Sequence, residues 1–238
     1  MSDILIGREK EYAQISALMS QRKNIAILGP EGVGKTAIIN KILADQFNSK
    51  KYLYSKDSST FREALTCLVL SGSNTRVKIR EKGIVALRKI LYSLLNKNPK
   101  YVIFDRIIRV ESKYCSFLEY LIEKNQPLII ISQGIDKKPM GYLRYLLHNF
   151  EKVEVLNFSR VATDRLVDHY IVKFNIRVAE PDSFKKAIFY FSKGNPRAVK
   201  QICSLARDTK YRKGESIDVR LINLDRRINF STLLKVNT

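Results

Sequence analysis

One short segment contains the residues with the clearest chemical role, Gly29-Pro-Glu-Gly-Val-Gly-Lys-Thr36. It matches the pattern GxxxxGK[ST] at every fixed position and lies between a short apolar run and a helical pattern, the context that this motif requires. Glycines let the backbone wrap around a phosphate with N–H groups pointing inward, and the following helix adds its positive end. The sequence therefore predicts nucleotide binding by Gly29, Pro30, Glu31, Gly32, Val33, Gly34, Lys35 and Thr36, with Lys35 on the β- and γ-phosphates and Thr36 on Mg²⁺.

A phosphate loop of this kind needs a carboxylate from a second strand to complete the magnesium site. The apolar run Tyr101-Val-Ile-Phe-Asp105 supplies Asp105, the second expected magnesium ligand, for which a helix N-cap is the alternative role. The next residue, Arg106, has a guanidinium that stays protonated and cannot activate water. Glu111 would replace it only if the loop folds back, and otherwise is a solvated loop residue. We therefore expect slow turnover.

Two further sites carry polar groups that can reach a nucleotide. Ser132 and Gln133 end an apolar run, where a polar side chain can orient water or contact the γ-phosphate. The segment Gly194-Asn-Pro-Arg197 has the pattern of a helix start, because Asn195 can cap the helix and proline fits the first turn. Arg197 then projects from a helix start toward a nucleotide, or is a surface arginine beside an ordinary cap.

Apolar periodicity predicts the elements that position these residues. Short apolar runs at 24–29, 52–54, 101–105, 128–132 and 153–156 are typical of buried strands. They alternate with helical patterns at 9–21, 37–47, 85–95, 116–123 and 141–148, and Thr60 with Glu63 has the spacing of a capping box that opens another helix. The expected fold class is α/β, a P-loop NTPase with a parallel sheet covered by helices on both faces.

The pattern changes after about residue 157, where helical segments follow at 162–173, 181–191 and 196–207. We expect three parts: an α/β nucleotide-binding core over 1–157, a small helical lid domain over 158–208 and a basic C-terminal tail over 209–238. Residues 209–215 have the composition of a basic loop.

The order of these motifs resembles that of AAA+ ATPases, over about residues 4–207. The nearest groups are the origin-recognition and initiator ATPases, the ATPases that regulate DNA transposition, and the STAND signalling ATPases. The resemblance implies ATP and Mg²⁺ as cofactors and catalytic roles for Lys35 and Asp105. It also implies an adenine pocket lined by Ile6, Gly7 and Arg8, a first sensor at Ser132 or Gln133, and a second sensor at Arg197.

The resemblance further implies that Arg144, in the helix before the fifth strand, completes the ATP site of a neighbouring subunit; the alternative is a solvated arginine. Arg106 departs from the family, most of whose members place an acidic residue there. About 30 residues follow Arg207, which we expect to be too few for the winged-helix domain of origin-recognition proteins. Size therefore favours the transposition regulators, which bind DNA through the ATPase core.

Charge indicates a polyanionic partner. The 238 residues include 43 Lys and Arg against 23 Asp and Glu, a net charge of +20, and residues 51–100 contain 11 basic and 3 acidic side chains. Such an uneven basic excess favours nucleic acid, whereas a lysine-rich composition throughout is the alternative. The segment 76–82 is expected to be extended or a hairpin with one basic face, or else a solvated loop. The expected DNA contacts are Lys56, Arg76, Lys78, Arg80, Lys82, Arg88 and Lys89.

Composition excludes several classes of protein. With 45% hydrophobic and 28% charged residues, the chain is globular rather than disordered. No apolar run approaches the ~18 residues that cross a bilayer, and the first residues lack the pattern of a signal peptide, so we expect a cytoplasmic protein without a membrane partner. Cys67, Cys115 and Cys203 are too widely spaced to indicate a disulfide framework or zinc site, and we expect them to be buried.

These features together predict an ATP-dependent switch: a slow ATPase that assembles on duplex DNA, as a ring or filament, without sequence specificity, and that has an unidentified protein partner. Two alternatives stay open. One is a STAND-like signalling ATPase whose output is a protein contact without DNA. The other is a nucleotide-binding scaffold that does not hydrolyse ATP.

Overall fold

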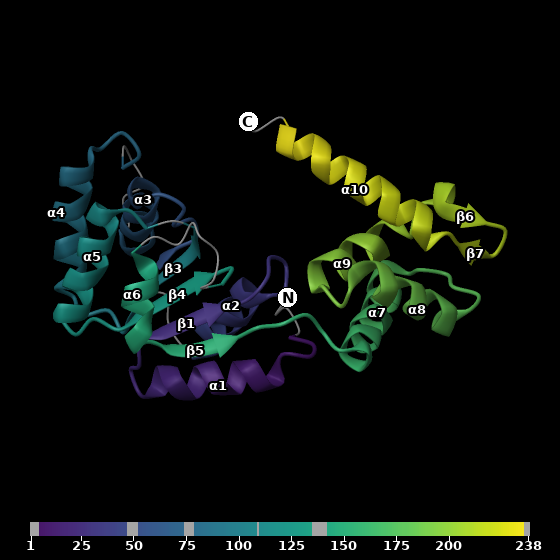
Figure 1. The fold of residues 1–238 in the computed structure, drawn as a ribbon, viewed down its shortest axis with the longest axis horizontal. Coiled ribbons are helices and arrows are strands. Elements are labelled where there is room, and N and C mark those ends of the chain that lie inside the picture. Colours follow the sequence, from purple (N-terminus) through teal and green to yellow (C-terminus); the bar gives the residue numbers. More distant parts are fainter. Residues whose placement is uncertain (1–4, 47–51, 74–78, 109, 135–141, 236–238) are drawn as a thin grey trace. The chain divides into compact units, whose positions relative to one another are not determined.

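A computed structural model describes residues 5–46, 52–73, 79–108, 110–134 and 142–235 (Figure 1). Contacts within the chain divide it into two compact units. The first contains the residues up to Glu31 and Lys35–Val155, and the second contains Gly32–Gly34 and the residues from Leu156 onward.

The first unit is built on a parallel sheet whose described strands have the order β2-β3-β4-β1-β5. Every residue of β1 and of β4 is buried, which requires a helical layer on each face of the sheet. The predicted α/β fold with a covered parallel sheet is therefore confirmed. The strands are β1 (Ile25–Leu28), β2 (Tyr52–Ser55), β3 (Tyr101–Ile107), β4 (Leu128–Ser132) and β5 (Glu151–Glu154).

Alternate residues along the strands face the two helical layers. One layer packs on Ala26, Val102 and Ile130 and contains four helices: α3 (Phe61–Gly72), α4 (Ile84–Leu95), α5 (Ser112–Glu123) and the short α6 (Leu143–Leu146), which continues into the 3-10 turn η3 (Leu147–Asn149). The other layer contains α1 (Glu9–Ser20) and α2 (Lys35–Gln46), which pack on each other. The single hydrogen of the Tyr101 hydroxyl is shared between the carbonyls of Met19 in α1 and Lys23 just after it, at 3.2 and 3.1 Å, which fastens the end of α1 to the sheet.

Most element boundaries differ from the predicted ones by a few residues. The Thr60 cap is present, because its hydroxyl accepts the Glu63 N–H at 3.2 Å. The helix expected over 116–123 begins earlier, at Ser112, and the strand expected over 153–156 is Glu151–Glu154. Residues 47 and 141, at the ends of two predicted helices, lie outside the described residues.

The second unit is mainly helical, as expected for the segment after residue 157. Its elements are α7 (Arg160–Phe174), α8 (Pro181–Ser192), α9 (Pro196–Leu205), the 3-10 turn η4 (Thr209–Tyr211), a hairpin of β6 (Arg212–Lys213) and β7 (Ser216–Ile217), and α10 (Val219–Lys235). Residues 209–238 were expected to form a separate basic tail and loop. Contacts group the described part of this segment, residues 209–235, with the second unit, and α10 packs against α8 and α9.

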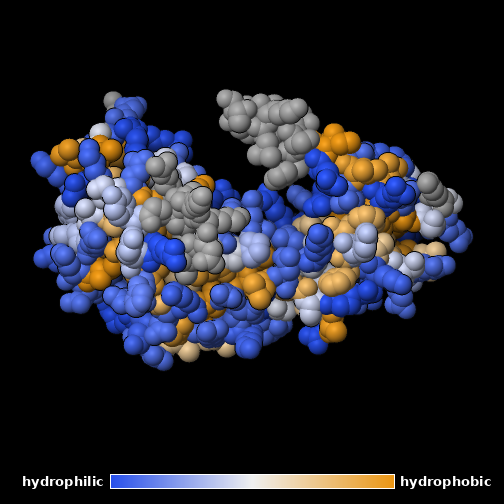
Figure 2. All heavy atoms as spheres, viewed as in Figure 1, coloured by the Kyte–Doolittle hydropathy of each residue, from blue (hydrophilic) through white to orange (hydrophobic). Residues whose placement is uncertain are grey.

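One face of α10 is apolar and uncovered by the described residues. Leu221, Leu224 and Ile228 recur at helical spacing and are 38%, 47% and 59% exposed. Figure 2 shows apolar side chains on this part of the surface.

Among the described residues, no helix is long and apolar enough to cross a membrane. Cys115 and Cys203 are buried and Cys67 is half-buried, and none of the three forms a disulfide.

The end of β1 depends on a glycine. Gly29 has φ +150°, and a Cβ on it would overlap the carbonyl oxygen of Val155, whose N–H donates to Leu28 at 2.7 Å. We expect Gly29→Ala to lower the free energy of unfolding by about 3 kcal/mol, because the methyl adds both backbone strain and a clash. Denaturant unfolding measures this loss.

Gly83→Ala is the matched control, since Gly83 has φ −70° and open space where its Cβ would be. It should change the free energy of unfolding by less than about 1 kcal/mol. Equal effects of the two substitutions would contradict the tight approach of Val155 to the end of β1.

Candidate nucleotide site

The glycine-rich loop connects the carboxyl end of β1 to the first residue of α2. Because β1 lies inside the sheet and α2 begins at Lys35, the loop lies where a central strand ends and a helix of 12 residues begins. Gly34 has φ +102°, a conformation that favours glycine, and open space where a side chain would be. Unpaired backbone N–H groups at a helix start attract anions. The loop therefore has the geometry of a phosphate-binding segment.

Lys35 folds back over this loop. Its ammonium donates to the carbonyl oxygens of Gly29 and Pro30 at 2.6 and 2.8 Å. Burial lowers the pKa of Lys35, whereas the nearby charges of Asp105 and Glu31 raise it. A partly desolvated cation at the loop is suited to pair with an anion there.

Asp105 meets α2 at the carboxyl end of β3. Its Oδ2 accepts a hydrogen bond of 2.6 Å from the Thr36 hydroxyl, and the residue is only 3% exposed. The structure thus brings together the two side chains that the sequence marks as magnesium ligands. A hydroxyl and a carboxylate oxygen are ligand types that Mg²⁺ takes, so this pair fits the expected ion.

Tyr54 also belongs to this cluster, and sequence reasoning missed it. Its hydroxyl donates to Oδ2 of Asp105 at 3.1 Å, and the residue is 7% exposed. Its position near the end of a short apolar run was the only signal in the sequence. The contact depends on the pairing of β2 with β3, which the sequence does not state.

Arg106 follows Asp105 in a left-handed conformation, with φ +59°. Its N–H donates to Oδ1 of Asp105 at 2.8 Å, while its side chain is exposed. The pairing of β3 with β4 shifts register between Phe104 and Ile107, so Arg106 lies in an irregular part of the strand. Glu111 is the exposed residue just before α5, and its side chain does not cap that helix.

Ser132 and Gln133 have different surroundings at the end of β4. The Ser132 hydroxyl is buried and donates to the Ile107 carbonyl at 3.0 Å, which ties β4 to β3 where their register shifts. The Gln133 side chain is exposed. Of the two expected sensor positions, Gln133 is therefore the more accessible.

The three residues expected at adenine precede α1. Ile6 and Gly7 are half-buried, and Gly7 has φ +70° and donates its N–H to Glu9 at 3.1 Å. Arg8 is 5% exposed and pairs with Glu11 at 2.5 Å. Burial lowers the pKa of Arg8, and Glu11 opposes this shift.

Arg144, expected to complete a neighbouring subunit's site, and Arg197, expected as the second sensor, are both exposed. Arg144 lies on α6, beside the buried Leu143. In the second unit, Asn195 caps α9 by accepting the Ala198 N–H at 3.2 Å, as expected, and Arg197 follows in the first turn. Within the same unit, the Arg197 N–H donates to the carbonyl of Gly32 at 3.1 Å.

The basic residues expected at DNA form an exposed set: Lys56, Arg80, Lys82, Arg88 and Lys89. Arg76 and Lys78 lie outside the described residues. Residues 79–82 are not extended but form a turn closed by the Lys82 N–H and the Ile79 carbonyl at 3.2 Å, which agrees with the hairpin or loop that the sequence also allowed. The physical reason is that Ile79 is buried in the apolar core, which draws the chain inward there.

Arg62 on α3 helps to hold this turn. Its guanidinium donates to the carbonyls of Arg80 and Lys82 at 3.2 and 3.3 Å. Farther along, on α4, the Arg88 guanidinium donates to the Tyr92 hydroxyl at 2.7 Å. The turn and the start of α4 therefore present charges from a fixed backbone.

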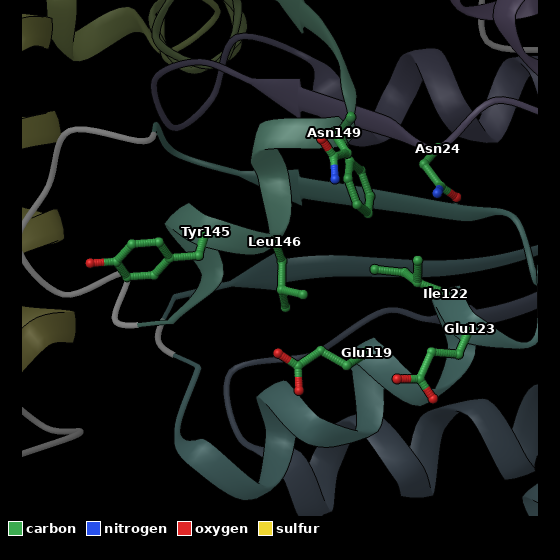
Figure 3. A pocket seen from close by; sticks show the side chains of 8 residues that line it. Asn24, Glu119, Ile122, Glu123, Tyr145, Leu146 and Asn149 are labelled. Atoms are coloured by element: carbon green, nitrogen blue, oxygen red, sulfur yellow. The ribbon is translucent and has the colours of Figure 1, made fainter.

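A cavity of about 280 Å³ lies at the opposite end of the strands from the phosphate loop (Figure 3). Its Asn24 directly precedes β1 and accepts the Leu128 N–H at the start of β4. Figure 3 shows Ile122 and Leu146 facing each other across it, with Glu119 and Glu123 along one side. The cavity is thus separate from the Thr36–Asp105 cluster.

No protein-family model matches the chain, and none of the curated proteins matches it in sequence. Solved structures do. A Walker-type ATPase of Pyrococcus abyssi has a TM-score of 0.64 at 13% identity, over 98% of this chain and 76% of its own. The Orc1 protein of Aeropyrum pernix in complex with DNA has a TM-score of 0.69 at 15% identity, over 94% of this chain and 66% of its own.

A RuvB variant of Thermotoga maritima has a TM-score of 0.57 at 17% identity, over 92% of this chain and 68% of its own. The chain thus spans roughly two thirds to three quarters of the length of these three structures. Their shared architecture defines the class: this chain has the fold of AAA+ P-loop ATPases, as the order of its motifs predicted.

Proposed function

We propose that this protein binds ATP with Mg²⁺ and hydrolyses it slowly, as an ATP-dependent switch that assembles on duplex DNA. The observation that carries the nucleotide part is the 2.6 Å hydrogen bond between Thr36 and Asp105, directly after a phosphate-binding loop. A hydroxyl at a helix start and a carboxylate at a strand end meet here from distant parts of the chain. This pairing fits the AAA+ fold that the chain shares with its structural relatives.

The roles of the residues follow from their positions. Loop N–H groups and the Lys35 ammonium bind the phosphates, and Thr36 with Asp105 would hold Mg²⁺, which neutralises charge on the phosphate oxygens. Ile6, Gly7 and Arg8 are proposed at the adenine, Ser132 or Gln133 as the first sensor and Arg197 as the second. The exposed Arg197 in the first turn of α9, directly after the Asn195 cap, supports that last assignment.

Slow turnover follows from the residue beside Asp105. Arg106 cannot accept a proton, and its side chain is exposed. Glu111 is exposed just before α5, and its side chain does not cap that helix, so it is the nearest acidic residue along the chain that can take part. A scaffold that binds but does not hydrolyse ATP is the alternative that Arg106 favours.

DNA binding rests on charge and exposure. The described basic residues between β2 and α4 are exposed, and the whole chain carries a net charge of +20. Exposed lysine and arginine side chains bind the phosphates of the DNA backbone without reading the bases. The Orc1 structure that the chain resembles contains DNA, which is consistent with this role although the binding is a property of Orc1. A signalling ATPase that contacts a protein instead is the alternative.

Lys35→Ala tests the nucleotide site. Removing the ammonium should weaken ATP binding by about 10- to 100-fold, because charge-assisted hydrogen bonds contribute about 1.5–3 kcal/mol. Calorimetric titration with ATP and Mg²⁺ measures the affinity. Lys41→Ala is the control on the same helix, since Lys41 is paired with Asp45 at 2.8 Å and should leave affinity unchanged. Equal ATP affinities of the unaltered protein, Lys35→Ala and Lys41→Ala would mean that the nucleotide does not bind at this loop.

Assembly is tested by turnover. We expect an ATP turnover rate below the ~10 s⁻¹ typical of enzymes. This rate should rise with protein concentration, because Arg144 of one copy completes the ATP site of the next. Steady-state phosphate release over a range of protein concentrations measures both. Arg144→Ala should abolish the rise, whereas Arg165→Ala, an exposed arginine on α7, should retain it. A turnover independent of concentration would contradict shared sites.

DNA binding is tested with a charge-matched pair of variants. Replacing Arg80, Lys82 and Lys89 by glutamine should weaken binding to any duplex and flatten its salt dependence by roughly 0.9 in slope per lost phosphate contact. The control replaces the exposed Lys10, Lys97 and Lys113, which removes the same charge. Fluorescence anisotropy at several salt concentrations reports both quantities.

Equal losses in the two triple variants would mean that only net charge matters, not this surface. No binding of the unaltered protein to DNA at low salt, with or without ATP, would favour the signalling alternative.

A further inference from the structure

We propose that Tyr54 is a positioning residue for the magnesium carboxylate: its hydroxyl fixes the rotation of Asp105 so that the Thr36–Asp105 pair is set for Mg²⁺. The inference rests on the proposed ATP–Mg²⁺ site and adds a residue to it. Tyr54 contributes no ligand of its own and acts through Asp105.

Strand register explains why this tyrosine reaches Asp105. Tyr54 pairs with Ile103 in the parallel β2–β3 ladder, and Asp105 lies two residues beyond Ile103 on the same face of the sheet. Side chains in strands lean along the strand direction, so a long side chain at Tyr54 extends toward position 105. The phenol oxygen ends 3.1 Å from Oδ2.

The Asp105 carboxylate accepts hydrogen bonds on both oxygens. Oδ1 accepts the Arg106 N–H at 2.8 Å, and Oδ2 accepts the hydroxyls of Thr36 and Tyr54 at 2.6 and 3.1 Å. One backbone donor and two hydroxyls leave a buried carboxylate little freedom to rotate. The Thr36 hydroxyl donates its hydrogen to Asp105 and keeps its oxygen lone pairs for Mg²⁺. Of the two side chains that donate to Asp105, Tyr54 is therefore the one that is not itself an expected magnesium ligand.

Tyr54 is itself held in place. Its backbone N–H donates to Ser71 Oγ of α3 at 2.9 Å, and its side chain is 7% exposed. A phenol carries its hydrogen at neutral pH, so the Tyr54 hydroxyl can donate to Asp105. Hydrogen-bond partners that orient metal ligands commonly change metal affinity 10- to 100-fold when they are removed.

The test is the magnesium dependence of nucleotide binding. The affinity for a fluorescent ATP analogue is measured with Mg²⁺ and with EDTA, and their ratio is the gain due to the metal. Tyr54→Phe, which removes only the hydroxyl, should leave the EDTA affinity within about twofold and reduce the gain by about tenfold. Tyr52→Phe removes the same atom from the same strand and should leave the gain unchanged.

A double-mutant cycle distinguishes positioning from general damage. In an Asp105→Asn background, adding Tyr54→Phe should reduce the gain no further, because both changes act on the same carboxylate. Thermal unfolding of each variant shows whether the fold is retained, and a Tyr54→Phe protein that fails to fold would overturn a role confined to positioning.

Other outcomes are equally decisive. An unchanged gain in Tyr54→Phe, or equal losses with Mg²⁺ and with EDTA, would overturn the inference while leaving the nucleotide site intact. An unaltered protein that binds no ATP analogue, or binds it with no gain from Mg²⁺, would contradict the proposed function, and this inference would fall with it.

Discussion

The hydrogen bond between Thr36 and Asp105 joins a helix start and a strand end that are 69 residues apart in the chain. It exists because β1 and β3 run parallel on either side of β4, so that the loop after β1 and the last residues of β3 meet at the same edge of the sheet. Around it lie the glycine loop, the ammonium of Lys35 and the hydroxyl of Tyr54. The rest of the first unit serves to keep this edge fixed, with helices on both faces of a buried sheet.

Burial of Asp105 is the main cost of this arrangement. An isolated carboxylate in a protein interior is destabilising by several kcal/mol unless donors surround it. Here three donors do so, two from side chains and one from the backbone of Arg106. The same donors that offset the cost also fix the carboxylate, which links the stability of this edge to its suitability for a cation.

The irregularity at Arg106 separates this chain from an ordinary strand at the same place. A non-glycine residue at φ +59° is strained by about 1–2 kcal/mol, and the strand regains its pairing only at Ile107. Ser132 stabilises that return by bonding the Ile107 carbonyl. The backbone at Arg106 is therefore shaped by the local pairing of β3 with β4, and the arginine side chain is exposed.

Sequence alone was sufficient for the motif-bearing parts of this protein. The spacing of Gly29 to Thr36 is a local property of backbone and helix start, and the apolar runs of β1, β3 and β4 are long enough to indicate buried parallel strands. Caps at Thr60 and Asn195 were also readable, because a cap depends only on residues within one turn. The α/β fold and its resemblance to AAA+ ATPases followed from these signals.

Tertiary structure decided what depends on pairing between distant segments. Tyr54 joins the site only through the register of β2 against β3. The alternation of basic and apolar residues suggested an extended segment, but the burial of Ile79 makes residues 79–82 a turn. Residues 209–235 form a 3-10 turn, a hairpin and a helix because their apolar side chains, such as Tyr211 and Ile222, are buried in the second unit. Burial of this kind is set by partners far away in the chain, which local composition does not reveal.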